Sequence, residues 1–309
     1  MAPKSPVAVS PLKANDIVGS VELESARMRF QYPIARAARA IQVAADRRDE
    51  YEGVLALGEA IAITLGASIT AGLRDITEDV PAFQALQAAF LARGVAEGHW
   101  INVIGATFSL IKGRSEVMLG LEKALQPGPR GSGLVADLKC LVEERNRWAH
   151  GARPRTPIEA ELRLAEIAVP LKNTLDRCSF LAESPWLLTT ASSYSRRQGD
   201  FLIAAAAAMG DHPDFQRQEF TSNTPLANGT FYLMSADGAV DLTPLIVMQY
   251  CDKCHQQELC YADRLDARDG VAFKSFARGH VIFDHTLDDE IRTILDSVEK
   301  PPKKGTYPQ

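Results

Sequence analysis

The chain has 309 residues, of which 46% are hydrophobic and 24% are charged, and its formal net charge is −5 at pH 7. This balance is typical of a globular protein with a substantial core. The acidic net charge excludes nucleic-acid binding through a broadly basic surface, so any polynucleotide would have to meet a local patch.

Neither end of the chain nor its most apolar stretch predicts a targeting or membrane segment. The start, "MAPKSPVAVSPLKAND", lacks the basic-then-apolar order of a signal peptide. The run Ala60–Leu73 is too short to cross a bilayer and is closed by Glu59 and Arg74, so it predicts a buried helix. The five cysteines are an odd number and favour reduced thiols. We therefore expect a cytoplasmic protein without a membrane partner.

The first half of the chain predicts helices. After a flexible lead-in over residues 1–24, breaks near Pro33 and Asp49 indicate a short helix followed by a long one. A further helix opens at Pro81 and ends at Gly94, an arrangement that helices favour because proline suits their first turn and glycine their end. Residues 25–183 are expected to be all-helical.

Two helices near the middle of the chain have well-marked limits. The loop "QPGPRGSG", residues 126–133, precedes a helix that Gly151 should end, with Pro154 close behind. The next helix should open with Thr156 as its N-cap and Pro157 at its first position. These signals place "VEERNRWAH" at the end of the first of the two helices.

The character of the sequence changes after Pro185. Short β-rich runs alternate with Asp-Gly turns, which predict hairpins, and a final helix is expected from Leu287 to Val298. The predicted fold class is α+β, with an all-α bundle over 25–187 and a smaller antiparallel α+β module over 188–298. Residues 299–309 should form a disordered tail.

The helix before Gly151 carries polar residues where apolar ones are expected. Leu134, Leu138 and Leu141 form an apolar stripe that continues to Arg145 and then to Trp148. A guanidinium on a buried line is costly unless a carboxylate, a phosphate or a partner surface meets it. Asn146 and His150 are four residues apart and share a helix face, so the amide can orient the imidazole.

Arg145 and Asn146, followed after three residues by His150 and Gly151 at a helix end, resemble the Arg-x4-His motif of the HEPN superfamily. The surrounding order of a helix pair, a Gly/Pro loop, the motif helix and a trailing helix resembles the helical bundle of that family. The resemblance covers about residues 30–183. The module that follows, with its Cys-x2-Cys turn, resembles the small β module found after such bundles in bacterial defence proteins.

The resemblance implies a dimeric, metal-independent endoribonuclease that acts in bacterial defence or toxin–antitoxin systems. His150 would be the general acid or base, Arg145 would stabilise charge on the phosphorane-like transition state, and Asn146 would orient His150 or the phosphate. The implied partners are RNA, a second copy bound through the bundle, and an antitoxin or other defence subunit. Ala152 stands where adenylylation-regulated members carry tyrosine, so the resemblance does not extend to that form of control.

Three further arginines adjoin the motif and are candidate RNA contacts: Arg147, Arg153 and Arg155. An alternative interpretation of the motif stays open, because basic residues are also favoured in a last helical turn by the helix dipole. Arg145 would then pair with Glu52, Glu59 or Glu122 inside the bundle. The protein would be a non-catalytic dimerisation or scaffold module with a C-terminal sensing or nucleic-acid-binding domain.

"QYCDKCHQQELC" places Cys251, Cys254 and Cys260 at a predicted hairpin turn. Cys-x2-Cys spacing lets two thiolates take adjacent corners of a zinc tetrahedron, so these three cysteines are the predicted metal ligands. A zinc ribbon needs a second pair, which the sequence lacks, and Cys260 or His280 would have to complete the shell. The alternatives are a structural zinc ion or a buried thiol pair; no cofactor is expected for catalysis.

Overall fold

The computed structural model describes residues 17–74, 80–112, 118–235 and 238–296. The predicted tail over 299–309, most of the predicted lead-in and the last two residues of the predicted final helix lie outside these ranges. The helices are α1 Val21–Arg29, α2 Tyr32–Gln42, α3 Arg47–Gly72, α4 Pro81–Phe90, α5 Glu97–Ile111, α6 Leu121–Leu125, α7 Leu134–Ala149, α8 Pro157–Arg177 and α9 Asp288–Asp296, with short 3-10 turns at Pro129–Gly131 and Cys178–Glu183.

The strands form two antiparallel sheets that follow the helices in sequence, which confirms the predicted α+β class. The five-stranded sheet has the order β3-β2-β1-β4-β5 and the four-stranded sheet the order β6-β7-β8-β9. The strands of the first are β1 Trp186–Ser195, β2 Asp200–Ala207, β3 Gln216–Ser222, β4 Phe231–Ser235 and β5 Gly238–Asp241; those of the second are β6 Ile246–Cys251, β7 Gln256–Asp266, β8 Gly270–Ser275 and β9 Val281–Asp284.

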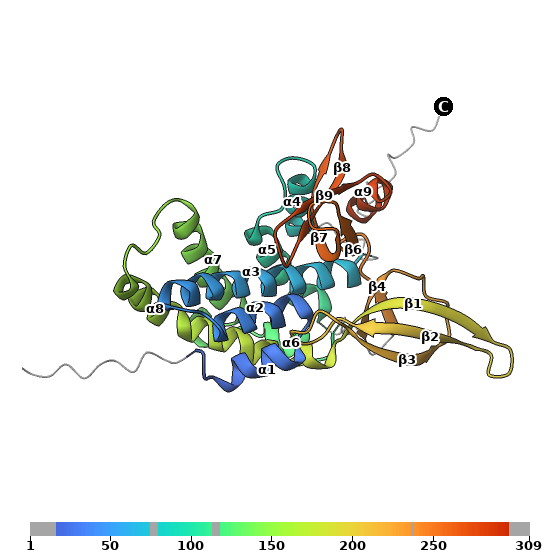
Figure 1. Ribbon diagram of the computed structural model, residues 1–309, viewed down its shortest axis with the longest axis horizontal. Helices are drawn as coiled ribbons and strands as arrows, with labels where there is room; N and C mark the ends of the chain where they lie inside the picture. The colour runs from blue at the N-terminus through green and yellow to red at the C-terminus, as the bar shows by residue number, and fades with distance from the viewer. Residues whose placement is uncertain (1–16, 75–79, 113–117, 236–237, 297–309) are drawn as a thin grey trace, which may run out of the picture.

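α3 is the central element of the helical bundle (Figure 1). It is long and apolar enough to cross a membrane by length and composition, yet 89% of its most apolar window is buried inside the protein. α2, α5, α7 and α8 pack against it. The predicted buried helix over Ala60–Leu73 is the second half of α3, and the Asp46 side chain caps the start of α3 by accepting from two backbone N–H groups.

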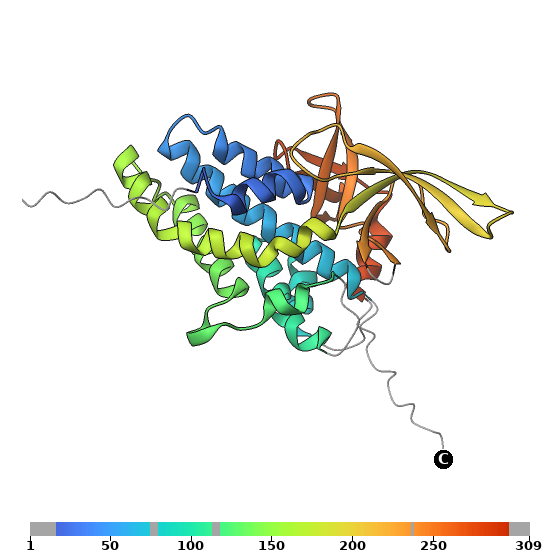
Figure 2. The ribbon, with the colours of Figure 1, turned by 90° about the horizontal axis from the view of Figure 1, so that it is seen from below.

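The helices and sheets share one hydrophobic core, so the two predicted units pack as one body. The Trp186 indole donates to Ser68 Oγ of α3 at 3.2 Å. The backbone N–H of Val95 donates to the Asp263 carbonyl of β7 at 2.8 Å. The four-stranded sheet lies against one side of the bundle, whereas the β1–β3 part of the five-stranded sheet extends away from it (Figures 1 and 2).

Most predicted element limits are confirmed, and two domain limits are shifted. The Thr156 hydroxyl accepts from Glu159 N at 3.1 Å as the N-cap of α8, and Gly151 ends α7 with φ of 92°. The lead-in was expected to reach residue 24, but Ile17 is buried and Ser20 caps a helix that begins at Val21. β1 begins at Trp186, two residues before the predicted module boundary, because its side chain belongs to the bundle's core.

The contact between α3 and α5 depends on a glycine. A Cβ added to Gly66 would lie 2.7 Å from Cε3 and 2.9 Å from Cβ of Trp100, whose side chain is fully buried and packs edge-on against Phe90. Such distances require the backbone or the indole to move. We expect Gly66→Ala to destabilise the protein by about 1–3 kcal/mol, because overpacking outweighs the gain in helix propensity.

Gly105→Ala is the matched control, because Gly105 also lies inside a helix but an added Cβ would meet Val135 at an ordinary 3.5 Å. It should be neutral or stabilising by up to about 1 kcal/mol. Urea unfolding of both variants checks the expectation. Equal free energies of unfolding for the two variants would contradict the assigned role of Gly66.

Candidate functional site

α7 carries the predicted Arg-x4-His motif to one end of the helical bundle. Leu138 and Leu141 are buried, and the Leu141 side chain packs over Gly58 of α3. The helix closes where His150 N donates to the Asn146 carbonyl at 3.0 Å and Ala152 N donates to the Arg147 carbonyl at 3.0 Å. The α7–α8 connection lies at the end of the bundle far from both sheets (Figures 1 and 2).

The side chains of His150 and Asn146 are both exposed at this end. No hydrogen bond joins the imidazole to any residue that the structure describes, so the predicted orientation of His150 by Asn146 is not formed within one chain. The helix nevertheless places both side chains on neighbouring positions of one face, one turn apart. An exposed imidazole of this kind is available to a ligand or to a second protein copy.

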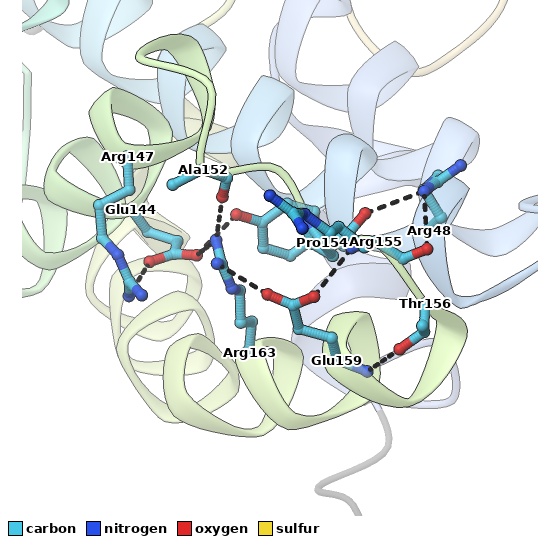
Figure 3. A network of polar contacts seen from close by, with 10 residues as sticks. Arg48, Glu144, Arg147, Ala152, Pro154, Arg155, Thr156, Glu159 and Arg163 are labelled. Atoms are coloured by element: carbon cyan, nitrogen blue, oxygen red, sulfur yellow. Dashed lines mark hydrogen bonds and ion pairs between the residues drawn. The ribbon is translucent and has the colours of Figure 1, made fainter.

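The buried polar residue of α7 is Glu144, one position before the arginine that the apolar stripe indicated. Glu144 is 4% exposed and lies on the line that begins with Leu138 and Leu141. The Tyr51 hydroxyl of α3 donates to Glu144 Oε1 at 2.6 Å, and Arg163 of α8 donates to the same oxygen at 3.2 Å. A buried carboxylate held by a tyrosine and a guanidinium therefore joins α3, α7 and α8 (Figure 3).

The network continues into the α7–α8 connection and fixes its backbone (Figure 3). Arg163 also donates to the Ala152 carbonyl at 2.5 Å and to Glu159 Oε1 at 3.0 Å. The other oxygen of Glu159 accepts from Arg155 N at 2.8 Å, and Arg48 donates to the Pro154 carbonyl at 2.9 Å. Burial and then the hydrogen bond to Glu144 raise the pKa of Tyr51 to about 12, so its hydroxyl stays a donor in this network.

The three arginines predicted to contact RNA flank His150 in the sequence, and they differ in their partners. Arg147 pairs with Glu144 Oε2 at 2.7 Å. The Arg153 guanidinium carbon lies 4.1 Å from the centre of the Trp148 ring, a cation–π contact. The Arg155 side chain is exposed, and within the described part of the chain neither it nor Arg153 pairs with a carboxylate. Of the three, Arg147 alone forms an ion pair in the described part of the chain, and the Glu159 carboxylate lies next to Arg155.

Arg145 faces a different environment from His150. Its Nη2 lies 3.6 Å from Glu59 Oε1 of α3, which is one of the three pairings that the sequence left open. Both side chains are about one-third exposed (35% and 29%), so water weakens the ion pair. A cavity of about 190 Å³ adjoins Glu59 and is also lined by Tyr261 and Lys274 of the four-stranded sheet. Within one chain, therefore, the Arg145 and His150 side chains do not contact a common residue.

Glu97, which sequence reasoning did not single out, lies beside this ion pair at the start of α5. It is 7% exposed, and its Oε2 is buried without a hydrogen-bond partner among the described residues. Burial, reinforced by the Glu59 carboxylate and opposed by Arg145, raises the pKa of Glu97 to about 8. Glu97 is therefore a neutral acid near pH 7, and Arg145 has Glu59 as its charged partner.

A second group of chemically active side chains lies in the four-stranded sheet, and we call it the cysteine cluster. Its members are Cys251, Cys254, Glu258 and His280, whose candidate ligand atoms all lie within 4.8 Å of one another. The His280 Nδ1 atom lies 3.2 Å from Cys251 Sγ and 3.0 Å from Glu258 Oε1. The Cys254 thiol donates to the same glutamate oxygen at 2.7 Å. Such a donor set is compatible with a structural metal.

The cluster differs from the predicted ligand set in one member. Cys260 is fully buried, and its thiol donates to the backbone carbonyl of Glu258 at 3.4 Å instead of joining the cluster. Burial raises the pKa of Cys260 to about 12, so its thiol stays protonated. Burial alone would raise the pKa of Glu258, but the groups bound to Oε1 (Cys254, Arg278 and His280) and the nearby Ser275 hydroxyl lower it to about 2. Glu258 was missed because a lone glutamate in a strand carries no spacing signal.

Comparisons with protein families, with curated proteins and with solved structures found no match to this chain. The assignment of its function therefore depends on the geometry of the two sites.

The buried Glu97 makes the stability of the protein depend on pH. Its pKa lies above the ordinary value of 4.5, so the folded state holds a proton that the unfolded chain releases. Stability is then fully present below pH 4.5 and is lost as the pH rises toward 8, by at most about 1.4 kcal/mol per pH unit. We expect Glu97→Gln to remove this loss, so that the variant exceeds wild type increasingly from pH 5 to pH 8.

Urea unfolding at pH 5, 7 and 9 measures the effect. Glu143→Gln, which removes an exposed carboxylate from α7, is the matched control and should follow the wild-type curve. Parallel pH curves for wild type and Glu97→Gln would contradict the assignment.

Proposed function

We propose that the protein is a metal-independent endoribonuclease whose active site forms between two copies of the chain at the ends of their α7 helices. The single observation that carries the proposal is the exposed His150 imidazole, beside Asn146. It is close in sequence to Arg153 and Arg155, whose guanidinium groups form no ion pair within the described residues. An imidazole can both accept and donate a proton near neutral pH, and neighbouring guanidinium groups suit a phosphodiester.

The proposed reaction is transfer within the RNA chain itself. His150 removes the proton from a ribose 2′-hydroxyl, whose oxygen attacks the adjacent phosphorus and forms a cyclic phosphate. His150 of the partner subunit gives a proton to the departing 5′-oxygen as the P–O5′ bond breaks. Arg145, a third exposed and only loosely paired with Glu59, exchanges that carboxylate for the phosphate and stabilises its added charge. Asn146 orients the phosphate or the imidazole.

The dimer that this reaction needs is supported by an apolar stripe on α8. Ile158, Leu162 and Val169 are exposed by 71%, 61% and 47%, and Ala165 lies between them. Their spacing of four, three and four residues puts them on one helix face, next to the fixed α7–α8 connection. Large exposed apolar residues in a row are typical of a protein–protein interface. We propose this face as the homodimer contact.

The remaining assignments follow from this proposal. The proposed setting is bacterial defence or a toxin–antitoxin system in the cytoplasm, with RNA as substrate and an antitoxin or other defence subunit as regulator. No metal takes part in the proposed catalysis. A metal held by the cysteine cluster would be a structural zinc ion, because the cluster lies in the four-stranded sheet on another part of the molecule from His150.

A specific observation favours a second candidate function. Arg145 is paired with Glu59 within its own chain, and Glu144 holds Arg147 and Arg163 in a network that already has a structural purpose. These ion pairs stabilise the bundle, and a non-catalytic dimerisation module needs no further role for the arginines. In that alternative, α8 supplies the contact between copies, and the C-terminal sheets bind the regulatory ligand.

The test compares wild type with His150→Ala on labelled structured RNA in the presence of EDTA. Wild type should cut the RNA and leave cyclic-phosphate ends, and His150→Ala should lose at least about 100-fold in rate, as expected when a general acid–base is removed. His212→Ala, which removes another exposed histidine in the β2–β3 loop, is the matched control and should cut normally. Equal cleavage by wild type and His150→Ala would refute the assigned role of His150.

The dimer is tested separately by Leu162→Glu. A charge on the exposed stripe should convert the dimer to a monomer in analytical ultracentrifugation and abolish cleavage while the circular dichroism spectrum stays unchanged. Leu91→Glu, at an exposed leucine that ends α4, should leave both the dimer and the activity intact. A dimeric wild type that cuts no RNA, together with a monomeric Leu162→Glu variant, would favour the scaffold function.

A further inference from the structure

The cysteine cluster joins three separate segments of the four-stranded sheet. Cys251 is the last residue of β6, and Cys254 lies in the turn that leads to β7. Glu258 is in β7, and His280 immediately precedes β9. The turn has a tight backbone, since His255 is the one described non-glycine residue with a positive φ (56°). The pairing of β6 with β7 and of β8 with β9 therefore brings together donors that are up to 29 residues apart.

The spacing of the four donors fits one small, four-coordinate ion. Zinc binds thiolate sulfur at about 2.3 Å and imidazole nitrogen or carboxylate oxygen at about 2.0 Å, so the ligand atoms of a tetrahedral site lie about 3.3–3.8 Å apart. The observed His280 Nδ1–Cys251 Sγ and His280 Nδ1–Glu258 Oε1 distances are 3.2 and 3.0 Å. The Cys254 Sγ–Glu258 Oε1 distance is 2.7 Å, and all four donor atoms lie within 4.8 Å of one another, so shifts of up to about 1 Å would admit the ion. Two sulfur donors favour zinc over magnesium or calcium, which prefer oxygen.

The charges around the cluster also fit a bound divalent ion. Two thiolates and a carboxylate together exceed the charge of one Zn²⁺, and the Arg278 guanidinium supplies a compensating positive charge. Arg278 lies 3.4 Å from Cys254 Sγ and 3.1 Å from Glu258 Oε1, and its other nitrogen donates to Gln256 at 2.8 Å. It is thus placed to hold both ligands from outside the first coordination sphere.

An independent observation points to a ligand at Glu258. The residue is 3% exposed, and its Oε1 receives Cys254, Arg278 and His280 within 3.1 Å. Its Oε2 is buried with no hydrogen-bond partner among the described residues. Buried polar atoms are normally hydrogen-bonded, and a buried oxygen without a partner is consistent with a ligand that completes its contacts.

We propose that the cysteine cluster binds one zinc ion in a closed, four-coordinate structural site, with Glu258 and His280 in place of the Cys260 that the sequence indicated. The ion ties the β6–β7 turn to the β8–β9 connection. This inference deepens the structural zinc named with the proposed function but does not rest on ribonuclease activity, because the metal is measured without RNA.

The experiment uses the full-length chain, purified without a histidine tag and stripped of metal, then titrated with Zn²⁺ in competition with a chromogenic chelator. Wild type should bind one equivalent, and Co²⁺ in its place should give the absorption of a tetrahedral ion with sulfur ligands. Cys254→Ser and His280→Ala should each weaken binding by more than about 100-fold, beyond the loss typical of residues outside the coordination sphere. Arg278→Gln should weaken it about 10–100-fold.

Three further variants separate this ligand set from its alternatives. Cys140→Ser, on α7, and His212→Ala remove residues of the same types outside the cluster and should leave zinc binding unchanged. Cys260→Ser, checked for its fold by circular dichroism, should still bind one equivalent. A wild-type protein that binds no zinc would overturn the proposal, as would zinc affinity that survives His280→Ala. Loss of zinc in a folded Cys260→Ser protein would overturn the proposed ligand set.

Discussion

The burial of the apolar part of α3, whose most apolar window is 89% buried, is the constraint on which the rest of the structure depends. A helix that is apolar all round cannot lie at a surface, so every side of it has to be covered by another element. The cover comes from helices along most of its length and from the sheets toward its C-terminal end. Three polar residues of α3 bind side chains outside the helix. Tyr51 binds Glu144, Glu59 pairs with Arg145, and Ser68 accepts from Trp186. With a rise of 1.5 Å per residue, α3 holds the first and last of them about 26 Å apart.

Four glutamates are buried in the part of the chain that the structure describes. Glu50 pairs with Arg47 at the start of α3, and the other three fall into two groups. Glu144 and Glu258 are each surrounded by donors that include at least one arginine. Glu97 has no such donor of its own and stays protonated near neutral pH. Glu144 joins the helices of the bundle, and Glu258 holds the turn of the four-stranded sheet. Glu97 is neutral, so Arg145 pairs with Glu59 instead. Glu144 and Glu258 thus have arginine ion pairs that Glu97 lacks among the described residues.

Local signals in the sequence predicted the elements well, because caps, prolines and glycines act within a few residues. Thr156 and Gly151 mark helix ends by their own hydrogen bonds and backbone angles. The apolar stripe of α7 was followed to Arg145, whereas the buried residue is Glu144. An apolar stripe on a helix is wide enough to include either Glu144 or Arg145. Glu144 is the buried one because its hydrogen-bond donors lie on α3 and α8, which are distant in sequence. In the same way, the Cys-x2-Cys spacing identified the turn of the cysteine cluster from the sequence. Glu258 joins that cluster through the pairing of the strands, which local spacing does not show.

The extended part of the five-stranded sheet is stabilised unevenly along its length. At its base, Trp186 and Phe231 belong to the main core, whereas farther out a separate small cluster of Ile203, Leu226 and Tyr232 holds the strands together. Little apolar surface is buried there, so opening the outer strands costs far less free energy than unfolding the bundle. Amide protons along β1 should therefore exchange with solvent in a graded order, fastest toward Ser195 and slowest beside Trp186. The outer strands can therefore open while the helical bundle stays folded.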